Sequence, residues 1–359
     1  MLHLTSFDRW TGASAPAYAE VEALRKSGVD AHYAFAGGSS LEEKVGHQPF
    51  AHPILHRAQT PRAVIRSVSS LRKLVREEGF ELIHSHLSHD HWLGYIARRP
   101  MNGVALVRTF HAARALRADM LTRRLVAGTD AVAVVSPALE EYPLIEGRQV
   151  RVTAPPAEPQ YHPNGPSVRP SLALSPNENL IGFIGKISPG RGFEEAIRTL
   201  AVLRARHQKF RLMIIGRGEH RFHLEKLASK LGVDREIIWA GYHEHDLPEH
   251  FRAVDLMLFT ARGSDEGHRA IIEAISCGTP VASYPIPGTE FILGSLSPKL
   301  VSTECTPESL ADVVEKVVRP ETLSPLRAQA ATEASRFSYD MTAQQLLALY
   351  RDAFDTARA

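Results

Sequence analysis

The chain alternates short apolar strand patterns with amphipathic helix patterns, and one proline-rich stretch interrupts this alternation. The first series of predicted strands covers residues 2–6, 30–36, 81–86, 104–111 and 128–136. The second series covers residues 180–185, 210–216, 236–241, 255–261 and 279–284. Strands that alternate with helices predict parallel βαβ units with helices on both faces of each sheet. We therefore predict an α/β protein with two doubly wound, Rossmann-like domains.

The interruption at residues 153–179 contains seven prolines, which is typical of a linker. This linker divides the chain into a first domain, residues 1–157, and a second domain, residues 158–338. A C-terminal helical segment, residues 339–359, follows them. A length of 359 residues is enough for two separate cores. Open parallel sheets bind ligands at the carboxyl ends of their strands, so two sheets that face each other are expected to enclose a cleft.

Composition excludes several classes of protein. Lys and Arg total 42 against 40 acidic residues, and this balance does not predict nucleic-acid binding. The two cysteines, Cys277 and Cys305, form neither a disulfide framework nor a zinc motif. No apolar run approaches the length of about 20 residues that spans a bilayer, and the N-terminus lacks the pattern of a signal peptide. We expect a cytoplasmic protein or one bound to a membrane surface.

The loop after the strand at 180–185 has the character of a phosphate site. Lys186 lies at the strand end, and Arg191 directly precedes a predicted helix, with Gly185 beside the lysine. The amides at a helix N-terminus and two cations together suit a diphosphate. The alternative is that both side chains are solvated loop charges.

Two further glycine loops give weaker signals. Gly216 and Gly218 resemble the start of a dinucleotide-binding fingerprint, but Arg221 occupies the position of the third glycine, and a tight turn explains the pair equally simply. Gly12 lies in a turn before a predicted helix, where it would let the backbone approach a ligand. An ordinary strand-to-helix turn is an equal alternative for Gly12.

The segment that begins at Gly263 reads GSDEGHRAIIEAISCGTPVAS. Asp265 and Glu266 precede a short apolar helix, expected at 267–276, and Glu273 lies on its second turn. A helix that serves only packing needs a single cap, so this density of polar residues indicates a ligand. The structural alternative is that Asp265 caps the helix and that Arg269 pairs with Glu273.

The order of these motifs resembles the retaining nucleotide-sugar glycosyltransferases of family 4, which have the GT-B fold. The shared motifs are the N-terminal glycine loop, HSH, RTFH, VVS, the proline-rich hinge, GKISPGRG, IIGRGE, WAGYHEHD and EAISCGTPV. The resemblance covers almost the whole chain. It implies two Rossmann-like domains that face each other across a cleft, with the acceptor in the first and the donor in the second. It also implies that the last helix, 339–357, crosses back to the first domain.

The chain departs from the family pattern at two places. The family usually has two glutamates with seven residues between them, and at the first of these positions this chain has Asp265. Either Asp265 takes that role with a shorter arm, or Glu266 does so through a loop shift; the spacing favours Asp265. The family usually has Arg and then Lys where this chain has Lys186 and Arg191, so the charges are kept with the identities exchanged.

The resemblance assigns roles to individual residues. The catalytic set is Lys186, Arg191, Asp265, Glu273 and His111. The two cations would stabilise the leaving nucleoside diphosphate, Asp265 would accept from sugar hydroxyls, and Glu273 from the ribose. Residues expected to contact the nucleotide sugar are Gly12, Gly185, Gly216, Gly218, Tyr242, His243, Glu266, Gly267, His268 and Arg269. The nucleotide base would lie against residues 241–246, and no metal or other cofactor is expected.

The run HSHLSHDH, residues 84–91, offers a metal site as an alternative, since two histidines separated by one residue can chelate an ion. No partner cluster with ligand spacing occurs elsewhere in the sequence. The histidines of this run are therefore predicted to be a mixture of exposed and acceptor-side residues.

Arginines concentrate in the first half, which has a net charge of +4 over residues 1–157. Residues 57–76 contain six cationic side chains and no acid, and residues 98–124 contain seven arginines against one acid. Such runs are usually solvated faces. In an acceptor-binding domain they also suit an anionic acceptor or an anionic lipid surface, at which the protein would associate peripherally.

These observations predict a retaining enzyme that moves a hexose-type sugar from a nucleoside-diphosphate sugar to a hydroxyl of a glycan, glycolipid or other acceptor. The expected setting is bacterial surface polysaccharide or glycoconjugate synthesis at the inner face of the membrane. Two alternatives remain open. One is a GT-B sugar-nucleotide epimerase or phosphorylase, and the other is a non-catalytic protein that binds sugar nucleotides.

Overall fold

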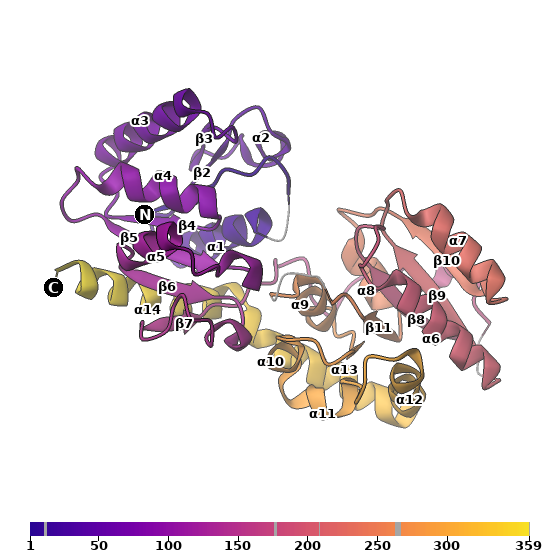
Figure 1. Ribbon diagram of the computed structural model, residues 1–359. Coiled ribbons are helices and arrows are strands. Elements are labelled where there is room, and N and C mark those ends of the chain that lie inside the picture. Colours follow the sequence, from indigo (N-terminus) through magenta and orange to yellow (C-terminus); the bar gives the residue numbers. More distant parts are fainter. Residues whose placement is uncertain (11–12, 176–177, 208, 263–266, 359) are drawn as a thin grey trace. The chain divides into compact units, whose positions relative to one another are not determined.

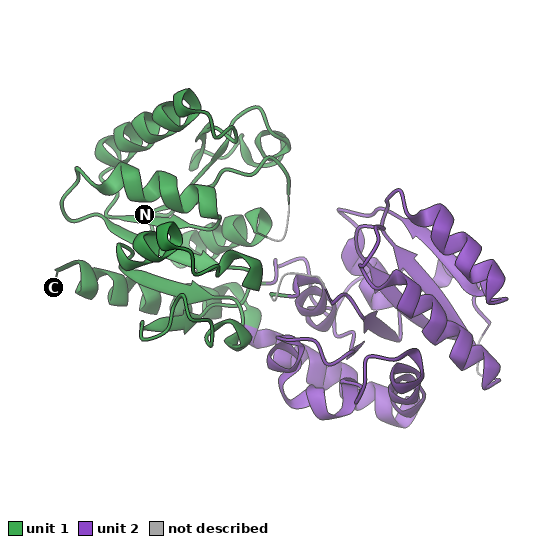
Figure 2. Ribbon diagram, viewed as in Figure 1, with its two compact units in different colours: residues 1–156, 265–267, 337–359 green, residues 157–264, 268–336 purple. Residues whose placement is uncertain are grey.

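The computed structural model describes residues 1–10, 13–175, 178–207, 209–262 and 267–358 (Figure 1). The chain divides into two compact units, coloured separately in Figure 2. The first comprises Met1–Pro156, Asp265–Gly267 and Phe337–Ala359, and the second comprises Ala157–Ser264 and His268–Arg336. Each unit contains one open parallel sheet.

The first unit is built on seven parallel strands in the order β3-β2-β1-β4-β5-β6-β7. Their bounds are β1 Leu2–Thr5, β2 His32–Ala36, β3 Ala51–Leu55, β4 Leu82–Ser85, β5 Ala105–Phe110, β6 Ala131–Val134 and β7 Val150–Val152. The strand order reverses between β1 and β4. In sheets of this kind the reversal opens a crevice at the carboxyl ends of the two strands.

Helices cover both faces of this sheet (Figure 1). On one face α3 (Pro61–Glu77) packs against α4 (Ser88–Arg98), and α4 contacts α5 (Met120–Ala127). On the other face α1 (Ser14–Lys26) lies along α14 (Tyr339–Arg358). The buried stripe of α14 consists of Leu346, Leu349, Tyr350 and Ala353, whose spacing of three and four residues is that of one helical face.

The second unit has five parallel strands in the order β10-β9-β8-β11-β12. Their bounds are β8 Asn179–Ile184, β9 Phe210–Ile215, β10 Ile237–Gly241, β11 Leu256–Phe259 and β12 Val281–Ser283. One group of helices that pack on each other is α6 (Phe193–Ala205), α7 (Arg221–Lys230) and α12 (Pro307–Val317). The other group joins α9 (Arg269–Ser276) to α8 (Leu247–Ala253), α10 (Thr289–Leu293) and α13 (Pro320–Ala334). The order reverses between β8 and β11.

The ten strands expected from the sequence are all present, so the α/β class with two Rossmann-like sheets is confirmed. Two strands were missed, and both are edge strands. β3 contains Pro53, which is tolerated at an edge because its missing N–H is not needed by a neighbour on that side. β7 is only three residues long. The short helices α2 (Ser40–Val45), α5, α10 and α11 (Ser297–Leu300) were also missed. Three of them, α2, α10 and α11, have six residues or fewer, too few to show a clear helical period.

No helix among the described residues combines the length and the apolar character needed to cross a membrane. Among the described residues of the proline-rich stretch before β8, the single short element is a 3₁₀ helix at Arg169–Leu172.

Two loops of the second unit lie so close together that they require glycine. A Cβ atom at Gly216 would lie 1.9 Å from the carbonyl oxygen of Gly185, and one at Gly218 would lie 2.0 Å from the carbonyl oxygen of Ile187. The amide of Ile187 donates to the carbonyl of Arg217 at 3.0 Å, which holds the loops together. Backbone packing between the β8–α6 and β9–α7 loops therefore accounts for this glycine pair.

We predict that Gly216→Ala destabilises the second unit by about 2 kcal/mol or more beyond the cost of Gly232→Ala. Gly232 also has a positive φ, of 68°, but a Cβ there would meet nothing within 4 Å. The Gly232→Ala control therefore includes the cost of placing alanine at a positive φ, about 1 kcal/mol. It does not include the collision between a Cβ atom and a neighbouring carbonyl oxygen. Urea unfolding of both variants measures the difference, and equal stabilities would contradict the close loop contact.

Candidate functional site

The β8–α6 loop brings two exposed cations to the carboxyl edge of the second sheet. Lys186 follows β8, and Arg191 precedes Gly192, the N-cap of α6. Neither side chain has an ion-pair or hydrogen-bond partner among the described residues. The first amides of α6 have no acceptor within the helix, so cations and amide donors gather at one place.

The start of α6 is fixed by its neighbour at the point where the strand order reverses. Gly192 has a φ of 85°, and a Cβ there would lie 2.4 Å from the Thr260 hydroxyl oxygen. The Thr260 hydroxyl, at the carboxyl end of β11, donates to the Gly192 carbonyl at 2.8 Å. A side chain at position 192 would push α6 away from β11, so this glycine sets where the helix N-terminus lies.

The neighbouring strand ends carry an aromatic ring with a cation stacked on it. Tyr242, directly after β10, is 51% exposed, and the Arg217 guanidinium lies 4.3 Å from its ring centroid. Arg217 lies between the two packed glycines, and no sequence motif pointed to it. His243 turns back on its own loop, because its ring nitrogens lie 2.9 Å from Asp246 and from the Ala240 carbonyl.

α9 begins later than expected. Its first residue is Arg269 rather than Gly267, and its N-cap is His268, in the left-handed region with a φ of 37°. The His268 ring packs against Phe259 and its Nε2 donates to the Pro287 carbonyl at 2.7 Å. The proposed cap at Asp265 is therefore wrong, since His268 occupies that position. Gly267 is buried, whereas Gly12, Asp265 and Glu266 lie outside the described residues.

Arg269 joins two carboxylates from distant parts of the sequence. Its Nε lies 2.5 Å from Glu273 on the next turn of α9, and its Nη2 donates to Glu158 at 2.6 Å. Burial raises the pKa of Glu273, and the Arg269 charge opposes that rise. Burial acts to lower the pKa of Arg269, but the two carboxylates prevail and raise it. The pairing of Arg269 with Glu273 was the structural alternative in the sequence, whereas Glu158, in the proline-rich stretch, gave no signal.

In the first unit, His111 directly follows β5 and is buried. Its Nε2 lies 3.2 Å from His86 Nδ1, and its Nδ1 has no partner among the described residues. Burial lowers the pKa of His111 to about 3, and the charges of Arg108 and Arg114 act in the same direction. His111 is therefore neutral at physiological pH.

The histidines of residues 84–91 do not include the exposed side chains that we expected. His84, His86 and His91 are buried, and His89 is partly buried. β4 is a central strand, and helices cover both of its faces. Side chains on either face of this strand are therefore shielded from water.

Two family models match this chain. Residues 166–337 match the family described as glycosyl transferases group 1, and residues 10–144 match Glycosyltransferase Family 4.

Relatives and solved structures agree with these matches. The D-inositol 3-phosphate glycosyltransferase of Rhodococcus erythropolis is 30% identical over 334 residues, which cover 83% of this chain and 74% of the relative. The fold resembles a glycosyltransferase from Rickettsia africae, with a TM-score of 0.83 at 13% identity over 98% of this chain and 97% of the other. It also resembles Anabaena HepE in complex with UDP and glucose, with a TM-score of 0.80 at 17% identity over 98% of both chains.

We predict that Arg269→Met destabilises the protein by about 3 kcal/mol, because it leaves Glu273 and Glu158 without their shared cation. The matched control is Arg221→Met, since Arg221 pairs with Glu225 four residues away but on the surface. Loss of that exposed pair should cost less than about 1 kcal/mol. Urea unfolding at neutral pH compares them, and similar losses would mean that the Arg269 network contributes no more than a surface pair.

Proposed function

The chain belongs to family 4 of the glycosyltransferases, with the GT-B fold, and from that membership we propose a specific reaction. It moves a hexose-type sugar from a nucleoside-diphosphate sugar to a hydroxyl of an acceptor, with retention of the anomeric configuration. The bond between the anomeric carbon and the diphosphate oxygen breaks, and that oxygen keeps both electrons. The acceptor oxygen then bonds to the anomeric carbon on the face that the diphosphate leaves.

The observation that carries this proposal is the pair of unpartnered cations beside the N-terminus of α6. An exposed ammonium and guanidinium that no described carboxylate neutralises are available to an anionic ligand. Lys186 and Arg191 lie next to the reversal between β8 and β11, where sheets of this kind bind ligands. We assign to them the stabilisation of the negative charge that develops on the leaving diphosphate.

We assign the nucleotide base to the exposed face of Tyr242. The Arg217 guanidinium already stacks at 4.3 Å on this ring, which supports a flat, partly cationic surface for a heterocycle. HepE, which has the same fold, is seen in complex with UDP, and this supports a nucleotide ligand. Uracil is accordingly the first base to test.

The remaining site residues keep the roles that the family suggests, as proposals. Glu273 would accept from the ribose, and Asp265 or Glu266 from the sugar. Gly12, Gly185, Gly267 and His268 would approach the donor through backbone. Neutral His111, with an unpartnered Nδ1, would contact the transferred sugar or the leaving phosphate. The two cations and the amides of α6 supply the electrophilic assistance, so the proposed reaction requires no metal at the diphosphate.

An anionic acceptor fits the first unit. The relative from Rhodococcus erythropolis is named for an inositol phosphate acceptor, which supports a phosphorylated acceptor here. A hollow of about 660 Å³ runs along α3. Its lining includes Ile65 and three cations, Arg72, Lys73 and Arg76, against one carboxylate, Glu77, which pairs with Lys73. Glycans and glycolipids of the bacterial surface that carry phosphate are acceptors of this chemistry.

The same unit has exposed apolar side chains beside arginines, which supports peripheral binding at the inner face of the membrane. Ile65 on α3 is 67% exposed, and Met120 and Leu121 at the start of α5 are 81% and 60% exposed. Exposed arginines flank each site, namely Arg62 and Arg66 on α3 and Arg117, Arg123 and Arg124 around α5. Apolar insertion and attraction to anionic lipid would act together.

We predict that Lys186→Ala lowers the transfer rate by about 100-fold or more and weakens UDP binding by about 10-fold or more, because a charge-assisted contact to the diphosphate is lost. Arg191→Ala should act in the same direction. Calorimetry with UDP, GDP and ADP identifies the base, and product analysis with and without acceptors measures transfer.

The control is Lys230→Ala, an exposed lysine in the last turn of α7, which should bind and transfer as the wild type does. Full activity of Lys186→Ala would remove the proposed role of this loop. Conversion of the sugar nucleotide without an acceptor would support an epimerase. Phosphate-dependent cleavage of a glycan would support a phosphorylase, and tight binding without turnover would support a binding protein.

We predict that the wild type sediments with vesicles that contain anionic lipid at low salt, and that Met120→Ser/Leu121→Ser weakens this association severalfold. The matched control is Phe222→Ser, since Phe222 is 66% exposed on α7 of the second unit. Equal sedimentation with neutral and anionic vesicles would exclude the electrostatic part of the proposal, and an unchanged double variant would exclude insertion at α5.

A further inference from the structure

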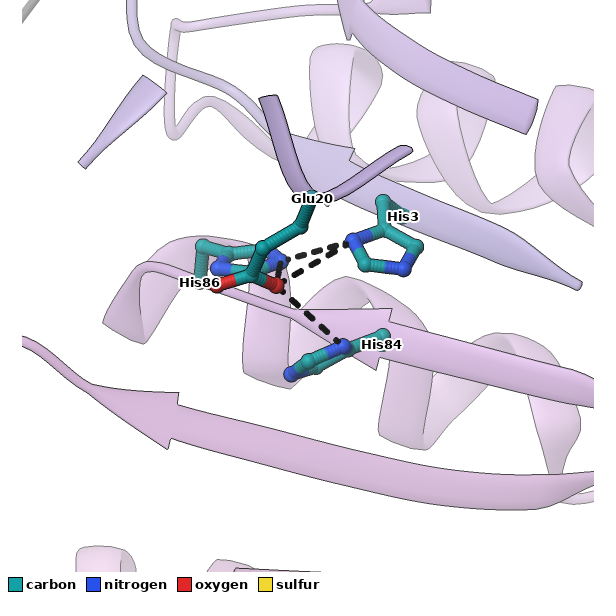
Figure 3. Close-up of side chains that lie close together, drawn as sticks. All are labelled: His3, Glu20, His84 and His86. Atoms are coloured by element: carbon teal, nitrogen blue, oxygen red, sulfur yellow. Dashed lines mark hydrogen bonds and ion pairs between the residues drawn. The ribbon is translucent and has the colours of Figure 1, made fainter. Parts of the chain in front are cut away.

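Three histidines and one glutamate meet inside the first unit (Figure 3). His3 lies on β1, His84 lies on β4, His86 follows β4, and Glu20 lies on α1. Each side chain is at most 1% exposed. His84 and His86 are two residues apart in extended chain, so their rings extend from the same face of the sheet.

The Glu20 carboxylate is directed at all three rings but forms a hydrogen bond with none of them. Its Oε2 lies 3.8 Å from His3 Nδ1, 4.0 Å from His84 Nδ1 and 3.7 Å from His86 Nε2. These distances are too long for hydrogen bonds, and Oε2 has no other partner in the described part of the chain. Ligand atoms around one tetrahedral zinc ion are separated by about 3.3–3.5 Å, close to these distances and to the 3.0 Å between His3 Nδ1 and His86 Nε2.

The second nitrogen of every ring is already engaged away from the cluster. His3 Nε2 lies 2.8 Å from the Tyr350 hydroxyl, His84 Nε2 lies 2.7 Å from the Thr109 hydroxyl, and His86 Nδ1 lies 3.2 Å from His111. Ligand histidines in proteins are oriented in this way, with one nitrogen on the ion and the other held by a hydrogen-bonding group. The four inward atoms, one from each residue, all lie within 4.8 Å of one another. Three of them have contacts that an ion would replace: His3 Nδ1 and His86 Nε2 lie 3.0 Å apart, within hydrogen-bond distance, and His84 Nδ1 lies 3.0 Å from the Tyr350 hydroxyl.

Charge gives a third, independent reason. No lysine or arginine in the described ranges lies within ion-pair distance of Glu20. A buried carboxylate without a cation is costly, and in proteins such groups are paired or coordinate a metal. A divalent ion at the centre would supply the missing positive charge and an acceptor for four lone pairs.

We propose that His3, Glu20, His84 and His86 bind a divalent transition-metal ion, with zinc as the ion that this donor set favours. Three imidazole nitrogens and one carboxylate oxygen form a ligand set that zinc accepts in tetrahedral geometry. All four positions are filled by protein, so the site is structural. It fastens α1 to β1 and β4. The rival interpretation is a cluster of hydrogen-bonded histidines with a protonated glutamate and no ion.

The four proposed ligands belong to the first unit, whereas the diphosphate loop belongs to the second. The experiment measures metal binding and Tm, so its outcome does not depend on transfer activity. A metal was the less favoured interpretation of residues 84–91, because no partner cluster with ligand spacing occurs elsewhere in the sequence. The fold supplies the partners from Glu20 and His3, 64 and 81 residues before His84.

The experiment uses the full chain without an affinity tag, because tag histidines would bind the probe. The protein is stripped with a strong chelator, titrated with Zn²⁺ and analysed for bound metal. We expect about one tightly bound zinc per chain and a higher Tm with zinc than without it. Cobalt in place of zinc should give the visible absorption of a tetrahedral nitrogen and oxygen site.

Variants separate the two interpretations. Glu20→Gln keeps the shape of the side chain but removes the ligand charge, so it should weaken zinc binding by more than about 100-fold and abolish the rise in Tm. A protonated glutamate in a cluster without metal would tolerate glutamine. Thr109→Val removes the hydroxyl that lies 2.7 Å from His84 Nε2 and orients that ring, and it should weaken zinc binding by about 10- to 100-fold.

The control is His220→Gln. His220 belongs to a partly exposed trio with Glu194 and His223 in the second unit, which could also attract metal. This variant should bind zinc as the wild type does. The proposal is overturned if the stripped wild type takes up no tight zinc and shows no change in Tm, or if Glu20→Gln binds zinc equally well. Should Glu20→Gln fail to fold, the cobalt spectrum and the Thr109→Val titration decide.

Discussion

Parallel hydrogen bonding in both sheets is the constraint on which the rest of this molecule depends. Parallel strands all end at one edge, so residues that follow different strands are brought together although they are far apart in sequence. In the second unit this edge collects Lys186 after β8, Arg217 after β9, Tyr242 after β10 and Thr260 after β11. An antiparallel sheet with the same strands would divide these residues between two opposite edges.

Close packing then fixes the loops at that edge. Glycines at positions 192, 216 and 218 leave room for backbone or hydroxyl atoms of the next loop, at distances where a Cβ would collide. Rigid loops hold the two cations and the amino end of α6 in place before any ligand binds. Electrostatic stabilisation is most effective when the charged groups need no rearrangement during the reaction.

Polar networks inside each unit join segments that are distant in sequence. Arg269 connects α9 to the proline-rich stretch through Glu158, and Tyr350 on the last helix connects to both His3 and His84. Such buried groups cost free energy unless every partner is in place. They therefore favour one arrangement of the chain, whereas the apolar contacts around them would tolerate several.

The sequence alone was enough to predict the class of the fold, since strand and helix periods depend on neighbouring residues, and to locate the cationic loop and the possible pairing of Arg269 with Glu273. It missed the two edge strands, because Pro53 and a length of three residues hide the strand pattern, and it placed the start of α9 two residues too early. The burial of most histidines of residues 84–91, and the part that Glu20 and Glu158 take in the polar clusters, became clear only from the three-dimensional contacts. Those contacts join residues separated by 64 and 111 positions, and no local pattern records which distant side chain a strand end or helix will meet.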